Sequence, residues 1–203
     1  MTIIIIIITV VVSIVAWQNR ELFGKLRFNA WYIRNDKEWY RFFSYALLHA
    51  DWGHLLVNMF VLWSFSDIVM RVFRLDFGAA AGFFFLLLYL GGVFFSTVFD
   101  YFKYRDNIYY NAVGASGAVS AVLFSSIILY PTGRIFFFFI PVGIPAWIFG
   151  ILYLVYSAYM SKRGGDNIGH NAHFWGAVYG VVFTLAVNGD NIVRFYRHLG
   201  ITL

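Results

Sequence analysis

Six long stretches without an acidic or basic residue constrain the fold of this 203-residue chain more than any other feature. The stretches without Asp, Glu, Lys or Arg are 1–19, 52–66, 77–99, 107–133, 135–161 and 167–189. A core helix of a soluble protein needs only one apolar stripe and carries charges on its other face. A helix that crosses a bilayer needs about 20 predominantly apolar residues. The pattern therefore predicts an all-α membrane protein with several spans.

The apolar runs predict six transmembrane helices in a single membrane domain, 1–203. The expected spans are about 2–17, 53–70, 78–97, 114–130, 135–159 and 171–188. The first run has no basic segment before it and no small-residue cleavage site after it, so we expect a retained span and not a signal peptide. Pro141 and Pro145 are expected to kink the fifth span. Asp67 and Arg71 are four residues apart and are expected to pair on one helix face.

Composition excludes several functional classes. The chain has no cysteine, which excludes disulfides, cysteine-ligated zinc, iron–sulfur clusters and a thiol nucleophile. Its net charge of +5 is scattered over the loops without a run of Lys and Arg, so we expect no nucleic-acid binding. We expect no metal and no organic cofactor. The first loop, 18–50, mixes aromatic and basic side chains, which is typical of a segment lying at the membrane interface.

Ser116 is a candidate nucleophile at the start of the fourth span. It lies in Gly114-Ala115-Ser116-Gly117-Ala118, where glycines leave its hydroxyl open to approach. The unpaired N–H groups of a helix N-terminus favour developing negative charge. A nucleophile beside oxyanion donors is half of a serine hydrolase. The alternative is that these small residues only mediate close helix packing.

His173 is a candidate general base in the sixth span. It shares one helix face with Gly176 and Gly180, a small-xxx-small pattern that lets another helix approach closely. Gly117 and Ala121 offer a matching face on the fourth span, and packing the two faces would bring His173 beside Ser116. The alternative is a hydrogen-bonded packing histidine.

His54 and Asn58 are four residues apart on one face of the second span. Both side chains can donate hydrogen bonds, which suits stabilisation of an oxyanion. The alternative is a polar contact between helices.

Together these motifs resemble those of the rhomboid family of intramembrane serine proteases, of the bacterial six-span type. The segments that carry the resemblance are Glu38–Phe43, Leu48–Met59 with the sequence LHADWGHLLVNM, Gly114–Gly117 and Ala172–Gly176. They fall in the first loop and in the second, fourth and sixth spans, and the resemblance covers nearly the whole chain.

The resemblance implies a six-transmembrane-helix rhomboid bundle with a large interfacial first loop, which cleaves peptide bonds in or near the membrane spans of other proteins. Ser116 would be the nucleophile and His173 the general base, in a dyad without a third acidic member. The side chains of His54 and Asn58 and the Ser116 backbone N–H would form the oxyanion hole. Close packing around the site would depend on Gly114, Gly117, Gly176 and Gly180.

Further roles follow from the same resemblance. Arg41 would help to fold the first loop. The fifth span, with Phe136–Phe139, would lie near the lateral entry of the substrate. Partners would be transmembrane protein substrates and membrane lipid; the oligomeric state is not predicted. The family places the termini in the cytoplasm and the site toward the outside, here expected in a bacterial inner membrane, whereas the loop charges alone do not decide the orientation.

Two positions depart from the family pattern. Many rhomboids carry an aromatic residue four positions after the nucleophile, packed on the catalytic histidine, and here that position is Ser120. We expect another ring to hold His173, with Phe174 or Trp175 as candidates. A Gly-x-x-x-Glu pattern that often ends the second span is replaced by Ser66 and Met70.

Other intramembrane proteases fit less well. A zinc protease needs the motif His-Glu-x-x-His, which is absent. An aspartyl protease needs two membrane aspartates that face each other, whereas Asp67 is expected to pair with Arg71. The remaining alternative is a rhomboid-like pseudoprotease, which would bind or escort membrane helices without cutting them.

Overall fold

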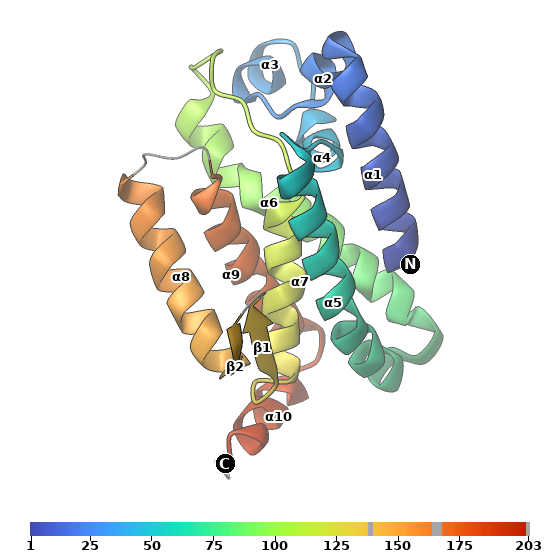
Figure 1. Cartoon of the computed structure of the whole chain (residues 1–203), viewed down its shortest axis with the longest axis vertical. Coiled ribbons are helices and arrows are strands. Elements are labelled where there is room, and N and C mark those ends of the chain that lie inside the picture. Colours follow the sequence, from blue (N-terminus) through green and yellow to red (C-terminus); the bar gives the residue numbers. More distant parts are fainter. Residues whose placement is uncertain (138–139, 164–167, 202–203) are drawn as a thin grey trace.

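The computed structural model describes residues 1–137, 140–163 and 168–201. The fold is mostly helical, with one antiparallel two-stranded hairpin among the described residues (Figure 1). In chain order the elements are α1 (Thr2–Gln18), α2 (Arg20–Leu26), α3 (Ala30–Asn35), α4 (Arg41–Ser44), η1 (Tyr45–Leu47), α5 (Trp52–Phe77), η2 (Gly78–Ala80), α6 (Ala81–Tyr104), α7 (Ser116–Leu129), β1 (Arg134–Phe137), β2 (Ile140–Pro145), α8 (Ala146–Arg163), α9 (His170–Val187) and α10 (Asp190–His198).

The short helix α7 lies at the centre of the bundle, where α5, α6 and α9 pack around it (Figure 1). Twelve of its 14 residues are buried. It ends at Leu129, two residues before Pro131, because a proline cannot continue the helical hydrogen bonds. The outer helices therefore shield α7, and only Ser116 at its start and Ile128 near its end are partly exposed.

Small residues let α9 pack against α7 backbone to backbone. A Cβ atom added at Gly176 would lie 2.1 Å from the carbonyl oxygen of Gly117. One added at Gly180 would lie 2.2 Å from the carbonyl oxygen of Ala121. Any larger residue would push the helices apart, so glycine is required at both positions.

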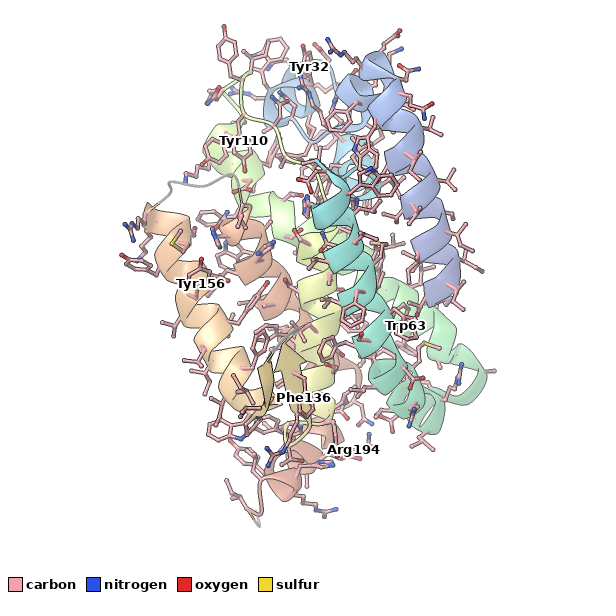
Figure 2. The ribbon with its side chains drawn as sticks, in the orientation of Figure 1. Tyr32, Trp63, Tyr110, Phe136, Tyr156 and Arg194 are labelled. Carbon is pink, nitrogen blue, oxygen red and sulfur yellow. The ribbon has the colours of Figure 1, made fainter. Side chains whose placement is uncertain are left out.

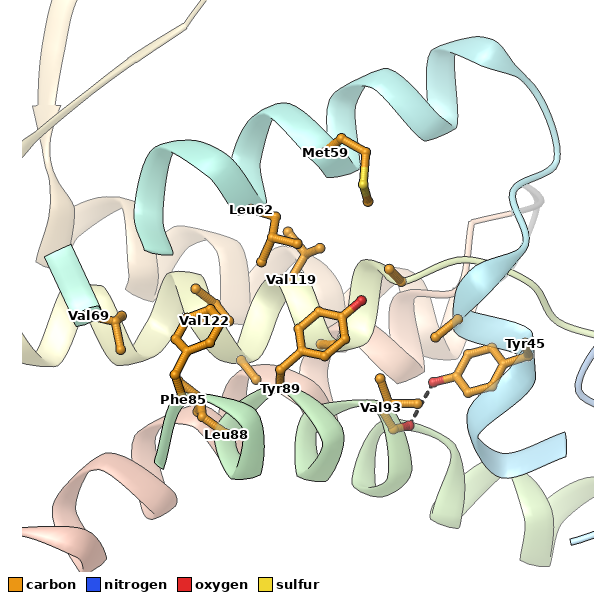
Figure 3. Close-up of a cluster of buried hydrophobic side chains, with 14 of the residues drawn as sticks. Tyr45, Met59, Leu62, Val69, Phe85, Leu88, Tyr89, Val93, Val119 and Val122 are labelled. Carbon is orange, nitrogen blue, oxygen red and sulfur yellow. Dashed lines mark hydrogen bonds between the residues drawn. The ribbon is translucent and has the colours of Figure 1, made fainter. Parts of the chain in front are cut away.

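Apolar side chains fill the space between α5, α6 and α7. Figure 3 shows Leu62 from α5, Phe85 and Leu88 from α6 and Val122 from α7 in this cluster, and all four are fully buried. The outer surface is apolar as well. Large exposed apolar side chains include Ile3, Ile7, Leu56, Trp63, Phe83, Leu152 and Val155. Soluble proteins rarely expose so much contiguous apolar surface, whereas lipid-facing helices do.

Length and composition alone identify few of these helices as membrane spans. Among the described residues, one continuous helical stretch, Trp52–Tyr104, is long and apolar enough to cross a membrane. Within it the chain turns back at η2 (Figure 1). A second such stretch is found if α9 and α10, which are bent by 112° relative to each other, are counted as one span. The helices α1 and α7 are apolar but shorter. The number of six spans therefore stays a prediction.

The prediction of a helix from residue 135 is wrong for its first part. Residues 134–137 and 140–145 form β1 and β2, and α8 begins only at Ala146. The hairpin pairs Ile135 with Ile144 and Arg134 with Pro145. Aromatic and β-branched residues favour strands, and prolines at 141 and 145 disfavour a continuous helix. Of the predicted run Phe136–Phe139, residues 138 and 139 lie outside the described residues.

Two ion pairs lie toward the end of the bundle opposite the first loop, and one of them joins two helices. Asp67 and Arg71 form the predicted pair, on the exposed surface of α5. Arg194 of α10 donates two hydrogen bonds to Asp76, at 2.6 and 2.7 Å. Figure 2 shows Arg194 and Phe136 at this end and Tyr32 and Tyr110 at the other.

Candidate active site

Ser116 is the first residue of α7 and is partly exposed, between buried neighbours. The turn before it depends on Gly114, whose φ of +117° is a conformation that only glycine adopts readily. The first N–H groups of a helix have no acceptor within the helix, and the helix dipole adds partial positive charge there. The backbone therefore presents hydrogen-bond donors next to the Ser116 hydroxyl.

The first loop holds the chain before Ser116. The Gly114 N–H donates to the carbonyl oxygen of Tyr45, at 3.1 Å. Phe28 and Ala112 exchange two backbone hydrogen bonds, at 3.0 and 3.1 Å. Figure 3 shows Tyr45 reaching α6, where its hydroxyl donates to the carbonyl oxygen of Val93 at 2.7 Å. The loop 18–50 is therefore part of the framework that sets the start of α7.

His49 is a fully buried residue of this framework to which the sequence reasoning gave no role. The Ser13 hydroxyl donates to the carbonyl oxygen of Leu47 at 2.8 Å, so it accepts the proton of His49 Nδ1 at 3.1 Å. His49 Nε2 then accepts from the Ala115 N–H, at 3.5 Å. Only a neutral imidazole can make both bonds. Burial, assisted by the neighbouring His54, lowers the pKa of His49 to about 3.

His54 packs directly on the turn before Ser116. A Cβ atom added at Gly114 would lie 2.5 Å from His54 Cε1, so the imidazole needs the space that glycine leaves. Asp51 caps α5 by accepting from the His54 N–H at 2.8 Å. The buried Asn58 donates from Nδ2 to the carbonyl oxygen of His54, at 3.0 Å. The structure therefore places both predicted oxyanion residues on α5, with the His54 ring against the turn.

His173 lies in the first turn of α9, with its N–H donating to the carbonyl oxygen of Gly169 at 3.0 Å. A Cβ atom added at Gly117 would lie 3.3 Å from the carbonyl oxygen of Ala172. The residues next to Ser116 and next to His173 are thus in backbone contact. The two side chains belong to the first turns of two helices that approach as closely as their glycines allow.

Tyr153 of α8 supplies the aromatic ring that covers His173. The two rings are stacked, with centroids 6.2 Å apart and planes 26° apart. The Tyr153 hydroxyl lies 2.7 Å from the hydroxyl of Ser120, one turn after Ser116 on α7. The absence of an aromatic residue at position 120 gave the sequence reasoning a reason to expect a ring from elsewhere, but no local pattern pointed to α8.

The two rings proposed from the sequence lie elsewhere. Trp175 stacks on Phe99 of α6, with centroids 5.3 Å apart. Phe174 packs edge-on against Trp175, at 5.5 Å. The residues that follow His173 in sequence point around the helix, away from the face that carries Gly176, so Tyr153 takes the place predicted for them.

Arg41 ties the first loop together from inside. Its guanidinium donates from Nη1 to the carbonyl oxygens of Gly24 and Arg27, at 2.9 and 2.8 Å. Its Nε forms an ion pair with Glu38. Only 5% of the Arg41 side chain is exposed, so these partners compensate a buried charge.

Metal ligands are not grouped near this site. In the ranges 1–137, 140–163 and 168–201, no three His, Cys, Asp or Glu side chains are close enough to hold a metal ion together.

Comparison with known proteins gives the same family as the motifs. Residues 36–189 match the family described as the Rhomboid domain. RHOMBOID-like protein 12, mitochondrial, of Arabidopsis thaliana is 31% identical over an alignment of 153 residues, and the match covers 68% of this chain and 43% of that protein. Rhomboid protein 1, mitochondrial, of Saccharomyces cerevisiae is 29% identical over 140 residues, 68% of this chain and 39% of the relative. Presenilin-associated rhomboid-like protein, mitochondrial, of Bos taurus is 28% identical over 139 residues, 66% of this chain and 34% of the relative. The chain spans less than half the length of these curated relatives, but the domain match covers most of it, and the chain is therefore a membrane protein of the rhomboid family.

Proposed function

We propose that this protein is an intramembrane serine endopeptidase with a Ser116–His173 dyad. One observation carries the proposal. The first turn of α9, with His173, lies against the first turn of α7, with Ser116, because Gly176 contacts Gly117 backbone to backbone. A nucleophile and a base on two fixed helices, beside free helix N–H groups, form the arrangement that acyl transfer needs.

The mechanism follows from these positions. A substrate span enters laterally beside α5 and α8, and its end unwinds because a helical peptide bond is sterically shielded. His173 removes the proton of the Ser116 hydroxyl as its oxygen attacks the peptide carbonyl. His173 then protonates the leaving amine, and water hydrolyses the acyl-enzyme. General acid–base catalysis of this kind contributes about 10²- to 10⁴-fold.

The oxyanion is stabilised from three directions. The Ser116 backbone N–H is one donor. The preceding N–H, that of Ala115, already donates to His49 Nε2 and is therefore not counted among the donors. His54 supplies a ring N–H, and Asn58 has a second amide hydrogen beyond the one that it gives to the His54 carbonyl. Losing one oxyanion donor typically costs about 10²- to 10³-fold in kcat.

The proposal includes a six-span arrangement in which α1, α5, α6, α7, α8 and α9 cross the membrane. Both termini would then lie on the cytoplasmic side, with the site opening to the outer side. The bacterial inner membrane stays a prediction, because the curated relatives compared above carry mitochondrial names.

Cleavage of a model transmembrane substrate by the purified protein in detergent, with EDTA present, tests the proposed activity. We expect cleavage by the wild type, none by Ser116→Ala, and a strong reduction in Asn58→Ala. The matched control is Ser126→Ala, which makes the same change on the same helix at a hydroxyl that donates within that helix, to the Leu123 carbonyl oxygen. A fluorophosphonate probe should label the wild type and this control but not Ser116→Ala.

The alternative function is that of a pseudoprotease, which binds membrane helices without cutting them. It would be supported by a folded wild type that neither cleaves any of several substrates nor reacts with the fluorophosphonate. Labelling without cleavage would instead leave Ser116 activated and point to an unsuitable substrate.

The topology can be tested separately, because the chain has no cysteine of its own. Tyr109, between α6 and α7, and Leu75, in the last turn of α5, are both highly exposed and lie at ends of the bundle that the proposal assigns to opposite sides. A membrane-impermeant maleimide added outside intact cells should label Tyr109→Cys and not Leu75→Cys. Labelling of both from one side would contradict the six-span arrangement.

A further inference from the structure

Asp100 of α6 is a buried carboxylate that binds one group from each side of the candidate dyad. Its Oδ2 accepts from the Tyr110 hydroxyl at 2.8 Å, and its Oδ1 accepts from the side-chain amide of Asn171. Tyr110 precedes Ser116 by six residues, on the segment between α6 and α7. Asn171 precedes His173 by two residues, in the first turn of α9.

We propose that Asp100 is a positioning residue, which sets Ser116 and His173 relative to each other by holding the segment before each. The inference rests on the proposed function and extends it to a residue outside the dyad and the oxyanion hole. A buried carboxylate loses its hydration, and hydrogen bonds to both of its oxygens compensate that loss. Because those bonds come from two different segments, the carboxylate fixes the distance between them.

On the side of the nucleophile, Tyr110 is fixed by more than its hydroxyl. Its ring stacks on the ring of Tyr104, with centroids 3.6 Å apart and planes 11° apart. The buried Asn29 of the first loop donates from Nδ2 to the carbonyl oxygen of Tyr110, at 3.2 Å. The chain that follows is held by the backbone bonds of Ala112 and Gly114 described above. Tyr110 therefore joins α6 to the framework that sets the start of α7.

On the side of the base, Asn171 is bonded at both ends of its side-chain amide. Its Nδ2 donates to Asp100 of α6, and its Oδ1 accepts from the Ser161 hydroxyl of α8 at 3.5 Å. The N-cap residue of α9 is Gly169, which has no side chain that could cap the helix. Contacts with neighbouring helices therefore have to fix this end of α9, and Asn171 makes two of them.

A second buried carboxylate ties the other end of α9 and supplies a matched control. Asp76 accepts from the side-chain amide of Asn188 at 2.9 Å and pairs with Arg194, and only 4% of its side chain is exposed. Asn188 follows the last residue of α9. Asp76 therefore anchors the same helix at the end remote from His173. If the two carboxylates contributed only to stability, the loss of either should have the same effect on catalysis.

Cleavage kinetics of Asp100→Ala and Asp76→Ala test the inference, at a temperature at which both variants are folded. We expect kcat of Asp100→Ala to fall about tenfold to 10²-fold with little change in KM, because small displacements of catalytic groups have effects of this size. Asp76→Ala should lower the thermal midpoint but keep kcat close to that of the wild type. Equal kcat values for the two variants would overturn the positioning role.

An exchange of the two side chains provides a second test, which also serves if Asp100→Ala does not fold. In Asn171→Asp a second carboxylate faces Asp100, and we expect most of the cleavage to be lost. In Asp100→Asn/Asn171→Asp the amide and the carboxylate have changed places. The amide oxygen at position 100 can then accept from Tyr110 while its nitrogen donates to position 171, so kcat should return to within a few-fold of the wild type. A double variant no more active than Asn171→Asp would contradict the inference.

Amide hydrogen exchange separates this inference from the proposed function, because it does not depend on cleavage. In Asp100→Ala the first turn of α9 should exchange faster than in the wild type, whereas in Asp76→Ala the faster exchange should lie near Asn188. A wild type without protease activity would overturn the proposed function and with it the role of Asp100 in catalysis. Unchanged exchange at the start of α9, in an enzyme that cleaves, would overturn the anchoring by Asp100 alone.

Discussion

The ring of Tyr153 lies stacked over the ring of His173, while its hydroxyl is 2.7 Å from that of Ser120. One side chain of α8 thereby contacts both the helix of the candidate base and the helix of the candidate nucleophile. Stacking restricts the orientation of the His173 imidazole plane. The contact between the Tyr153 and Ser120 hydroxyls holds the tyrosine ring in position over that imidazole. The orientation of the base therefore depends on α8 staying in place.

Removal of this ring should reduce activity more than removal of its hydroxyl. We expect Tyr153→Ala to lower kcat by about tenfold to 10²-fold, because misplacing a catalytic group by about 1 Å has effects of that size. Tyr153→Phe keeps the stacking and should lose only a few-fold. The control is Tyr156→Ala on the same helix, whose ring packs against His170 instead. Equal kcat values for Tyr153→Ala and Tyr156→Ala would refute the positioning role.

Close packing of α9 on α7 predicts that Gly176→Ala is severe. The new Cβ atom would lie 2.1 Å from the Gly117 carbonyl oxygen, so the helices must separate and carry His173 away from Ser116. We expect loss of cleavage and a destabilisation of about 1–3 kcal/mol, typical of overpacking. Gly189→Ala, where a Cβ atom meets nothing within 4 Å, should be neutral. The difference between Gly176→Ala and Gly189→Ala is measured as their cleavage rates and their thermal unfolding midpoints.

The neutral state of His49 predicts a loss of stability in acid. Its pKa is about 3 in the fold and about 6.5 in the unfolded chain. Between these values the unfolded state binds the extra proton, so the contribution is complete above pH 6.5 and is lost as the pH falls toward 3. The slope is about 1.4 kcal/mol per pH unit for one proton.

His49→Asn keeps a donor toward Ser13 but does not titrate, so its stability should fall less than that of the wild type between pH 7 and 5. His198→Asn, at the exposed end of α10, serves as the control and should follow the wild type. Thermal midpoints across this pH range measure the difference. Parallel curves for all three proteins would show that His49 does not carry the effect.

Arg41 should contribute far more to stability than an exposed arginine of the same loop. Arg41→Ala removes two bonds to backbone carbonyl oxygens and leaves Glu38 unpaired, which we expect to cost about 3–5 kcal/mol. Arg34→Ala breaks an exposed pair with Asp106 and should cost about 1 kcal/mol or less. Chemical denaturation in mixed micelles can compare the two. Similar losses would contradict the proposed role of Arg41 in holding the loop.

Sequence patterns anticipated the contacts that repeat along a helix. Gly176 and Gly180 are four residues apart and meet Gly117 and Ala121, which have the same spacing. Such regular spacing is visible in the sequence because it follows the helical period. The strands β1 and β2 were not predicted because the uncharged run of phenylalanine and isoleucine that begins at residue 135 has no clear period, and length then favours a helix.

Contacts made by a single side chain across a large sequence distance were not predictable. Tyr153 is one of 14 tyrosines, and nothing next to it in sequence relates it to His173. His49 was visible in the same motif as His54, but its bond to the Ala115 N–H depends on how the first loop folds over α7. Tertiary geometry, which local patterns do not encode, decides both.

The enclosure of α7 has a consequence for biosynthesis. Its 14 residues rise about 21 Å, less than the roughly 30 Å of the hydrocarbon layer. Two of its serines have partners that are translated later, since Ser120 meets Tyr153 and Ser125 accepts from Thr184 of α9. While the chain is still being made, α7 is therefore a short helix whose serines do not yet have these partners. A chain cut short before α8 would lack the partners of both hydroxyls and also His173, so the candidate nucleophile is made before the contacts that enclose its helix and before the candidate base.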